Sequence, residues 1–156
     1  MKWLGKIVVS DRPSPNHYLA TAYKVVKRTE PIDWAEAGPI YRFPINAALC
    51  TPSTKEIAAG KVRVSGYALP TGRSGAKITS VKVRSGKKDW IDAKLLGEQR
   101  DYCWTLWTAA LPIAQGNNVL QVRANDSSGG FMPFRVPWNA KGYLQNSWFR
   151  KEITGT

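Results

Sequence analysis

The segment KVRVSGYA, residues 61–68, begins with a strict alternation of polar and apolar side chains. Successive side chains of a β-strand point to opposite faces of a sheet, so this alternation predicts a strand whose Val62 and Val64 point inward. The segment SVKVR, residues 80–84, repeats the pattern with Val81 and Val83. Both segments therefore predict strands that bury one face and expose the other.

More strands of this kind are expected from Pro44 onward, because turn signals recur about every 8–12 residues. The expected strands cover residues 90–95, 102–111 and 118–124, and a last strand begins in 131–136. Turns are expected at residues 85–89 and 125–130. About seven strands without a convincing helix predict an all-β fold, an antiparallel β-sandwich. The inward positions predict a core of Val62, Val64, Val81, Val83, Trp104, Leu106, Leu120 and Val122.

The first 44 residues are expected to be irregular. Residues 3–9 predict one strand, and residues 11–16 a loop with two prolines. Residues 17–26 are consistent with a strand or with a short irregular segment. Residues 31–44 hold three prolines and one glycine, which is typical of a connector, with one helical turn expected at 33–36.

The chain is strongly basic, with 23 Lys and Arg against 11 Asp and Glu and a net charge of +12. Nucleic acid, an anionic membrane, an acidic protein or a small anion would all suit this charge. Outward positions carry Lys61, Arg63, Lys82, Arg84 and Arg123, so a basic outer face is expected if these strands share one sheet. A solvated face that protects strand edges is the alternative.

Nucleic-acid and membrane partners are not expected. Most Trp residues occupy core or tail positions, and the chain has no basic arm that would bind a nucleic acid. No window approaches the roughly 20 apolar residues of a membrane span.

The sequence contains no complete active site. His17 is the single histidine and lies in a proline-rich loop. Cys50 and Cys103 match no metal-binding spacing. Two buried free thiols are expected, with a single disulfide as the alternative. No glycine-rich phosphate loop is present.

Several motifs together resemble the C-terminal dimerisation domain of the sulfite oxidase family. They are PINAALCTP at 44–52, VSGYA at 64–68, VKV at 81–83 with Trp90, WTLW at 104–107, VRANDS at 122–127 and WNAKGYLQNSW at 138–148. Upstream, KWL at 2–4 and YK at 23–24 resemble the last part of that family's molybdenum-cofactor domain. The resemblance covers essentially the whole chain.

The resemblance implies an immunoglobulin-like sandwich that forms a homodimer. Residues 1–43 would then be the end of the cofactor-binding domain and a connector, and residues 44–156 the dimerisation domain. In the full-length enzyme, molybdenum in a molybdopterin cofactor would oxidise sulfite to sulfate by oxygen-atom transfer. The cysteine that binds the metal belongs to the preceding domain, so this chain alone is expected to bind no cofactor and to be inactive.

The resemblance also implies three site residues. Lys2 corresponds to a lysine that contacts the pterin cofactor, and Tyr23 to a tyrosine in the substrate site. Lys141 occupies a position where the family often has an arginine facing the anionic substrate. Lysine keeps the charge but lacks the planar guanidinium fork, so the substrate need not be sulfite.

The irregular tail VPWNAKGYLQNSW, residues 136–148, has two interpretations. In the first, Trp138 and Trp148 pack beneath it, amide side chains pair with its backbone, and it presents Lys141 at a domain boundary. In the second, it only closes one end of the sandwich. A free-standing sandwich that binds a polyanion or a carbohydrate is the alternative to the dimerisation module.

Overall fold

The computed structural model describes residues 3–26 and 37–156, which form two compact units. The smaller unit comprises residues up to Tyr41 together with Pro137–Tyr143, and the larger unit comprises Arg42–Val136 with Leu144–Thr156. Within these described ranges, the single helix is the π-helix η1, Tyr18–Ala22, which is far too short to cross a membrane.

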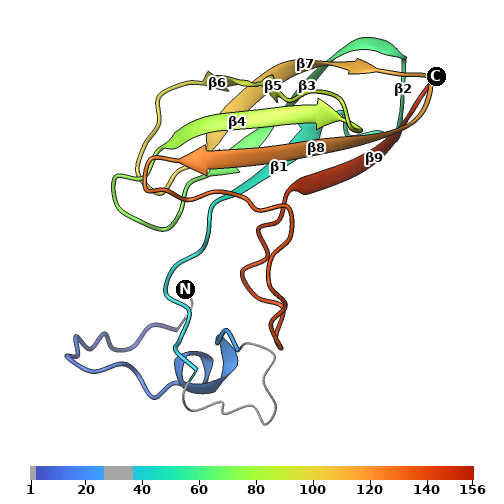
Figure 1. The fold of residues 1–156 in the computed structure, drawn as a ribbon. Helices are drawn as coiled ribbons and strands as arrows, with labels where there is room; N and C mark the ends of the chain where they lie inside the picture. The colour runs from blue at the N-terminus through green and yellow to red at the C-terminus, as the bar shows by residue number, and fades with distance from the viewer. Residues whose placement is uncertain (1–2, 27–36) are drawn as a thin grey trace. The chain divides into compact units, whose positions relative to one another are not determined.

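The larger unit is built from two sheets (Figure 1). One sheet has the order β1-β3-β7-β6. Its strands are β1 Asn46–Thr51, β3 Gly60–Leu69, β7 Thr105–Ile113 and β6 Lys94–Leu96. The other sheet has the order β2-β9-β8-β4-β5. Its strands are β2 Glu56–Ile57, β9 Phe149–Gly155, β8 Gly116–Asp126, β4 Ile78–Ser85 and β5 Ile91–Asp92.

The predicted all-β class is confirmed. Neighbouring strands are antiparallel except β2 and β9, which pair in parallel. The described residues form nine strands, more than the roughly seven predicted. Three of the nine, β2, β5 and β6, are only two or three residues long. The immunoglobulin-like connectivity stays a prediction.

The alternating segments are strands, as predicted, and they supply the core. Five of the predicted core residues, Val64, Val81, Val83, Leu120 and Val122, are at most 1% exposed. Val62 is half-buried and packs against the same cluster. The cluster draws on both sheets, so the core lies between them.

The predicted orientation of β7 is wrong. Trp104 is 64% and Leu106 59% exposed, whereas Thr105 and Trp107 are buried. The run WTLW has bulky side chains at both parities, so alternation does not reveal its inner face. The polar Thr105 is tolerated inside because its hydroxyl donates to Gln99 Oε1 at 3.1 Å.

Other predicted elements differ from the structure. Residues 3–9 form no strand, and the helical turn expected at 33–36 lies outside the described residues. The last strand is β9, not residues 131–136, which contribute one isolated bridge between Phe131 and Asn125. Pro133 and Pro137, in and after that segment, lack the N–H group that pairing in a sheet needs. The sequence of β9, FRKEITG, has consecutive charged residues, so it shows no clear alternation of polar and apolar side chains.

The two cysteines are exposed free thiols, so the prediction that they are buried is wrong. Cys50 follows Leu49, where a register shift between Leu49 and Thr51 breaks the alternation of β1. Cys103 lies in the turn that precedes β7, outside any strand.

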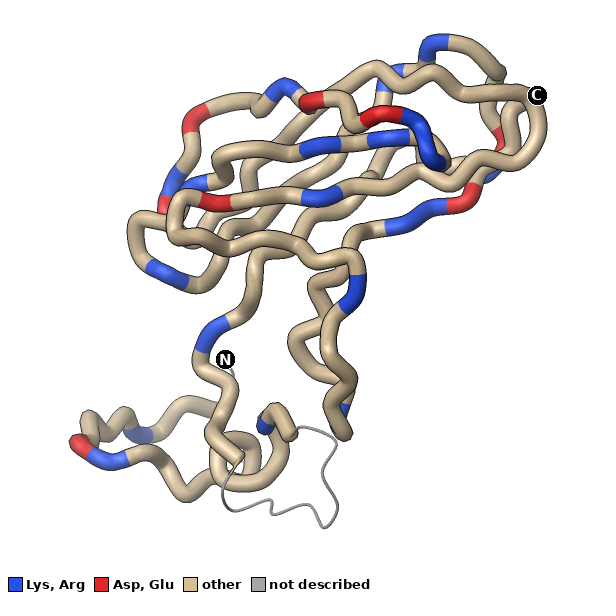
Figure 2. Tube along the Cα trace, in the orientation of Figure 1, with Lys and Arg blue, Asp and Glu red and all other residues tan. Residues whose placement is uncertain are grey.

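The basic residues do not share a single sheet. Lys61 and Arg63 lie on β3 in the four-stranded sheet, whereas Lys82, Arg84 and Arg123 lie on β4 and β8 in the other. Figure 2 shows blue segments, which mark Lys and Arg, along the front strands β4 and β8. The condition for one continuous basic face is therefore not met.

Trp107 packs directly on Gly66, its partner in the register of β3 and β7. A Cβ atom on Gly66 would lie 2.6 Å from Trp107 Cζ2 and would also overlap the carbonyl oxygen of Ala48. The indole ring is fully buried, and its Nε1 has no hydrogen-bond partner among the described residues. Trp107 therefore stabilises the fold by its volume, and only glycine fits beneath it.

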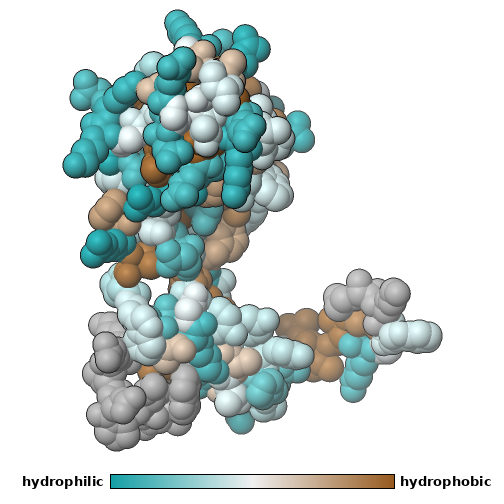
Figure 3. Space-filling view, turned by 90° about the vertical axis from the view of Figure 1, so that its right-hand side faces the viewer, coloured by the Kyte–Doolittle hydropathy of each residue, from teal (hydrophilic) through white to brown (hydrophobic). Residues whose placement is uncertain are grey.

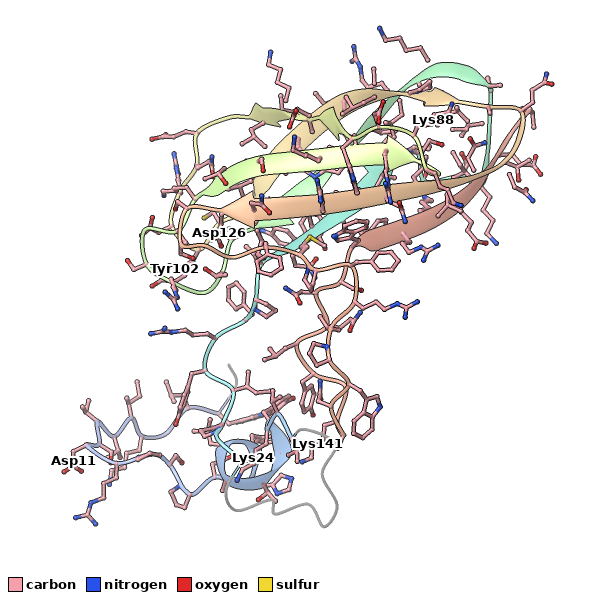
Figure 4. The ribbon with its side chains drawn as sticks, viewed as in Figure 1. Asp11, Lys24, Lys88, Tyr102, Asp126 and Lys141 are labelled. Carbon is pink, nitrogen blue, oxygen red and sulfur yellow. The ribbon has the colours of Figure 1, made fainter. Side chains whose placement is uncertain are left out.

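Asp126 closes the loop at the opposite end of the sandwich from Lys88 (Figure 4). Its Oδ1 accepts from the backbone N–H groups of Ser128 and Gly130 at 3.0 and 2.8 Å, and from the Ser128 hydroxyl at 2.8 Å. Its Oδ2 accepts from Thr71 N at 2.8 Å. Burial raises the pKa of the Asp126 carboxyl, but these hydrogen bonds outweigh it and lower the pKa below its ordinary 3.8.

Substituting Gly66→Ala should lower the free energy of unfolding by about 3 kcal/mol, because the added methyl group overpacks the core. Urea denaturation measures the change. Gly38→Ala is the matched control, since no atom lies within 4 Å of a Cβ at that position. Equal stability of the two variants would show that the contact between Trp107 and Gly66 is not tight.

Substituting Asp126→Asn should cost about 2 kcal/mol near neutral pH, because an amide cannot accept all four hydrogen bonds. A lowered carboxyl pKa stabilises the fold above the pKa of the unfolded chain, and this stabilisation disappears as pH falls through the lower folded pKa. The difference between wild type and variant should therefore shrink below about pH 4 in urea denaturation. Asp89→Asn, at an exposed turn, is the control. A difference that is the same at all pH values would contradict the prediction.

Candidate functional site

The smaller unit is organised around the π-helix η1. Asn16 starts it: its side chain accepts from Tyr18 N at 2.9 Å and its carbonyl from Ala20 N at 2.9 Å. The helix ends where Tyr23 N donates to Tyr18 O at 3.0 Å, the wider spacing of a π-turn. Tyr23, a predicted site residue, therefore lies at the C-terminal end of this turn.

Lys141 binds the same end of η1. Its Nζ donates to Thr21 O at 2.7 Å and to Ala22 O at 2.8 Å. The last carbonyl groups of a helix lack partners within the helix, and a cation is favourable beside them. An ammonium group from a distant part of the sequence thus completes this helix end.

The loop that carries Lys141 is a tight turn. Asn139 Oδ1 accepts from Tyr143 N at 3.1 Å, and its Nδ2 donates to Tyr143 O at 2.9 Å. Gly142 has a φ of 68°, a conformation that favours glycine, and its N–H donates to Asn139 O at 3.1 Å. The amide of Asn139 therefore pairs with the tail backbone, as the first interpretation of the tail predicts.

Tyr23 lies close to the loop that carries Lys141. Lys141 binds the carbonyl groups of the two residues before Tyr23, and Tyr143 of the same loop contacts the Tyr23 ring. The Tyr23 ring is 5.2 Å from the ring of Tyr143 and 6.0 Å from that of Tyr18, measured between centroids. Tyr23 remains 46% exposed. The structure thus brings together two of the three predicted site residues, whereas Lys2 lies outside the described residues.

Lys24 is a buried cation that sequence reasoning did not single out. It is 5% exposed and lines a cavity of about 380 Å³ in the smaller unit, with Pro13, Leu19 and Tyr41. Figure 4 labels it together with Lys141. Its position next to Tyr23 was the one sequence signal that pointed to it. Burial of an ammonium group is costly unless the charge is paired, so a buried lysine is an unusual feature of a small unit.

The two tail tryptophans behave differently. Trp148 is half-buried in the larger unit, where its Nε1 donates to Met132 O at 2.9 Å and its ring lies 5.0 Å from Phe134. Trp138 belongs to the smaller unit and is 60% exposed. The expected packing beneath the tail is therefore wrong for Trp138, because the tail divides between two units.

Trp148 also belongs to an arginine–tryptophan cluster on the five-stranded sheet. The guanidinium carbons of Arg84 and Arg123 each lie 4.4 Å from the Trp90 ring centroid. They lie 5.3 and 5.4 Å from that of Trp148. These distances are typical of cation–π contacts. Beside the cluster, Arg123, Asn125, Phe131 and Phe134 line an open groove of about 640 Å³.

Metal ligands do not gather anywhere in residues 3–26 and 37–156, since no three His, Cys, Asp or Glu side chains are close enough to hold an ion. His17 is exposed and contacts the ring of Tyr18 at 5.6 Å. Near the C-terminal end of η1 the smaller unit places the Lys141 ammonium group and the phenols of Tyr23 and Tyr143, which suit an anion better than a metal ion.

The family model for the Mo-co oxidoreductase dimerisation domain matches residues 37–156. Mitochondrial sulfite oxidase of Drosophila melanogaster is 30% identical over 98% of this chain and 30% of that protein. Sulfite oxidase of Arabidopsis thaliana is 27% identical over 96% of this chain and 42% of that protein. Nitrate reductase [NADPH] of Emericella nidulans is 28% identical over 99% of this chain and 22% of that protein.

Among solved structures, the sulfane dehydrogenase SoxCD from Paracoccus pantotrophus has a similar fold. The TM-score is 0.70 at 18% identity, over 89% of this chain and 36% of that chain. The present chain therefore spans less than half the length of each of these relatives. Its match to the family model covers all the strands of the sandwich and the tail. The chain belongs to the Mo-co oxidoreductase dimerisation domain family and is a dimerisation domain of the sulfite oxidase type.

Proposed function

We propose that this chain is the self-associating module of a molybdenum-dependent oxidoreductase that resembles sulfite oxidase. The full-length enzyme would oxidise sulfite, or a related small anion, by oxygen-atom transfer. The observation that carries this proposal is the family match over residues 37–156, on a fold with two packed sheets. It favours a homodimerising module over a free-standing sandwich that binds a polyanion or a carbohydrate.

The molybdenum cofactor would be held mainly by a preceding domain. When bound, molybdopterin supplies the metal at which oxygen-atom transfer takes place. The described residues fit a supporting role toward it, because the smaller unit offers the Tyr23 phenol and the Lys141 ammonium group as hydrogen-bond donors for an anion. In the family, the cysteine that binds the metal belongs to the preceding domain, and neither Cys50 nor Cys103 lies in such a motif, so this chain alone is not expected to bind the cofactor or to catalyse the reaction.

Each proposed site residue has a distinct task. The Tyr23 hydroxyl would donate a hydrogen bond to the substrate anion without adding charge. Lys141 would provide positive charge while its bonds to Thr21 O and Ala22 O hold it in place. Lys2 would contact the pterin. In this assignment residues 1–43 complete the cofactor domain and connector, and residues 44–156 bind a second copy.

The isolated chain should sediment as a dimer at micromolar concentrations, with about twice the 17.3 kDa of one copy. Because each copy carries a net charge of +12, added salt should strengthen the association by screening the repulsion. Sedimentation velocity at low and at moderate ionic strength measures both effects. A strict monomer under all conditions would contradict the proposed function.

In the full-length enzyme, Lys141→Ala should raise the KM for the anionic substrate about 10–100-fold, because a charge-assisted contact is lost. Lys141→Arg should restore most of the affinity, since it keeps the charge. Steady-state kinetics measures both parameters.

Lys151→Ala is the matched control for Lys141. The Lys151 ammonium also donates to two backbone carbonyls, those of Pro52 and Ser53, but it lies in the larger unit. An equal rise of KM in both variants would mean that Lys141 has no particular role in substrate binding.

A further inference from the structure

The outer face of the four-stranded sheet carries an apolar row that crosses all four strands. In the strand register, Ala48 of β1 is opposite Tyr67 of β3, Tyr67 is opposite Leu106 of β7, and Leu106 is opposite Leu96 of β6. Residues directly opposite one another share a face of the sheet. Since Trp107, the next residue after Leu106, points into the core, this row points away from it.

The row is exposed and is extended by a tryptophan. Leu106 is 59% and Leu96 39% exposed, while Tyr67 is half-buried. Trp104 is 64% exposed, and its ring packs edge-on against that of Tyr67 with centroids 4.9 Å apart. A continuous exposed cluster of aromatic and leucine side chains is typical of an interaction site rather than of free surface.

Charge distinguishes this row from the outer face of the five-stranded sheet, which carries Lys82, Arg84 and Arg123. Its own five residues, Ala48, Tyr67, Leu96, Trp104 and Leu106, are all uncharged. Basic residues of the same face lie farther along the strands, at Lys61 and Arg63 of β3, and Lys94 of β6 flanks the row. Figure 3 shows the end of the sandwich near the C-terminus, where hydrophilic residues prevail.

The outer face of the five-stranded sheet is less suitable for self-association. Its strands present Lys82, Arg84, Arg123 and Arg150, and Lys82 alone of these four forms an ion pair among the described residues, with Asp92 at 2.8 Å. Two copies that met through this face would bring like charges together at the centre of the contact, which costs several kcal/mol.

We propose that the apolar row of Ala48, Tyr67, Leu96, Trp104 and Leu106 is the surface through which two copies of this chain bind. This inference rests on the proposed dimerising function and names the surface that performs it. A two-fold axis that lies in the interface and runs along the row, across the strands at Tyr67 and Leu106, makes the two rows face each other, as an isologous interface requires. This axis also separates the two Arg63 residues by about 26 Å, twice four residues at about 3.3 Å per residue.

The first test introduces a charge at the centre of the row. Leu106→Lys should raise the dimer dissociation constant at least about 100-fold, because two like charges would meet across the axis. Phe131→Lys is the matched control. Phe131 is 63% exposed, the added charge is the same, and the residue lines the groove beside Arg123, outside the apolar row. Its dissociation constant should not change. Sedimentation velocity reads both, with thermal unfolding to show that each variant is folded.

A mixing experiment tests the symmetry. Leu106→Glu alone should also be monomeric, whereas an equimolar mixture of Leu106→Lys and Leu106→Glu should recover dimers, because opposite charges then face each other at the axis. Trp104→Ser, an uncharged change outside the strand ladder, should weaken the dimer in the same direction. It keeps the test decisive if a charge at position 106 prevents folding.

The outcomes separate the two proposals. A wild-type monomer in all conditions would overturn both the dimerising function and the inference. A wild-type dimer that survives Leu106→Lys and Trp104→Ser, but that Phe131→Lys dissociates, would keep the function and move the interface to the groove. Monomeric Leu106 variants whose mixture restores dimers would establish the apolar row as the interface.

Discussion

The packing of Trp107 on Gly66 is the contact on which the rest of the sandwich depends. It joins the centres of β3 and β7 and sets their register, because only glycine leaves room for the indole ring. Shifting a strand by one residue exchanges its two faces, so the same contact directs Tyr67 and Leu106 outward. A single steric requirement thus determines both the core and the exposed apolar row.

The smaller unit depends on a different interaction, the capping of a short π-helix by a distant lysine. The carbonyls of Thr21 and Ala22 need donors, and Lys141 supplies them from the tail. This capping fixes the ammonium group next to Tyr23. In the proposed enzyme, the residue that completes the helix end would therefore also place positive charge beside the substrate.

The high positive charge of the chain is organised rather than uniform. On the five-stranded sheet, Arg84 and Arg123 stack on Trp90 and Trp148, which holds two guanidinium groups side by side without a carboxylate between them among the described residues. On the four-stranded sheet, the apolar row stays neutral. Like-charge repulsion would then disfavour an approach through the five-stranded sheet and favour one through the apolar row, which increases the selectivity of the association.

The sequence by itself determined the all-β class, the strands with strict alternation and most of their core residues, because a period of two leaves one possible inner face. The order of its short motifs also indicated the family. It did not determine the inner face of β7, where WTLW is bulky at both parities, or reveal β9, whose charged residues hide its period. Only the tertiary structure decided that Thr105 and Trp107 point inward and that Lys141 binds the carbonyl groups of Thr21 and Ala22, just before Tyr23. The physical reason is that these arrangements arise from steric fit and hydrogen bonds between segments far apart in the chain, which no local pattern records.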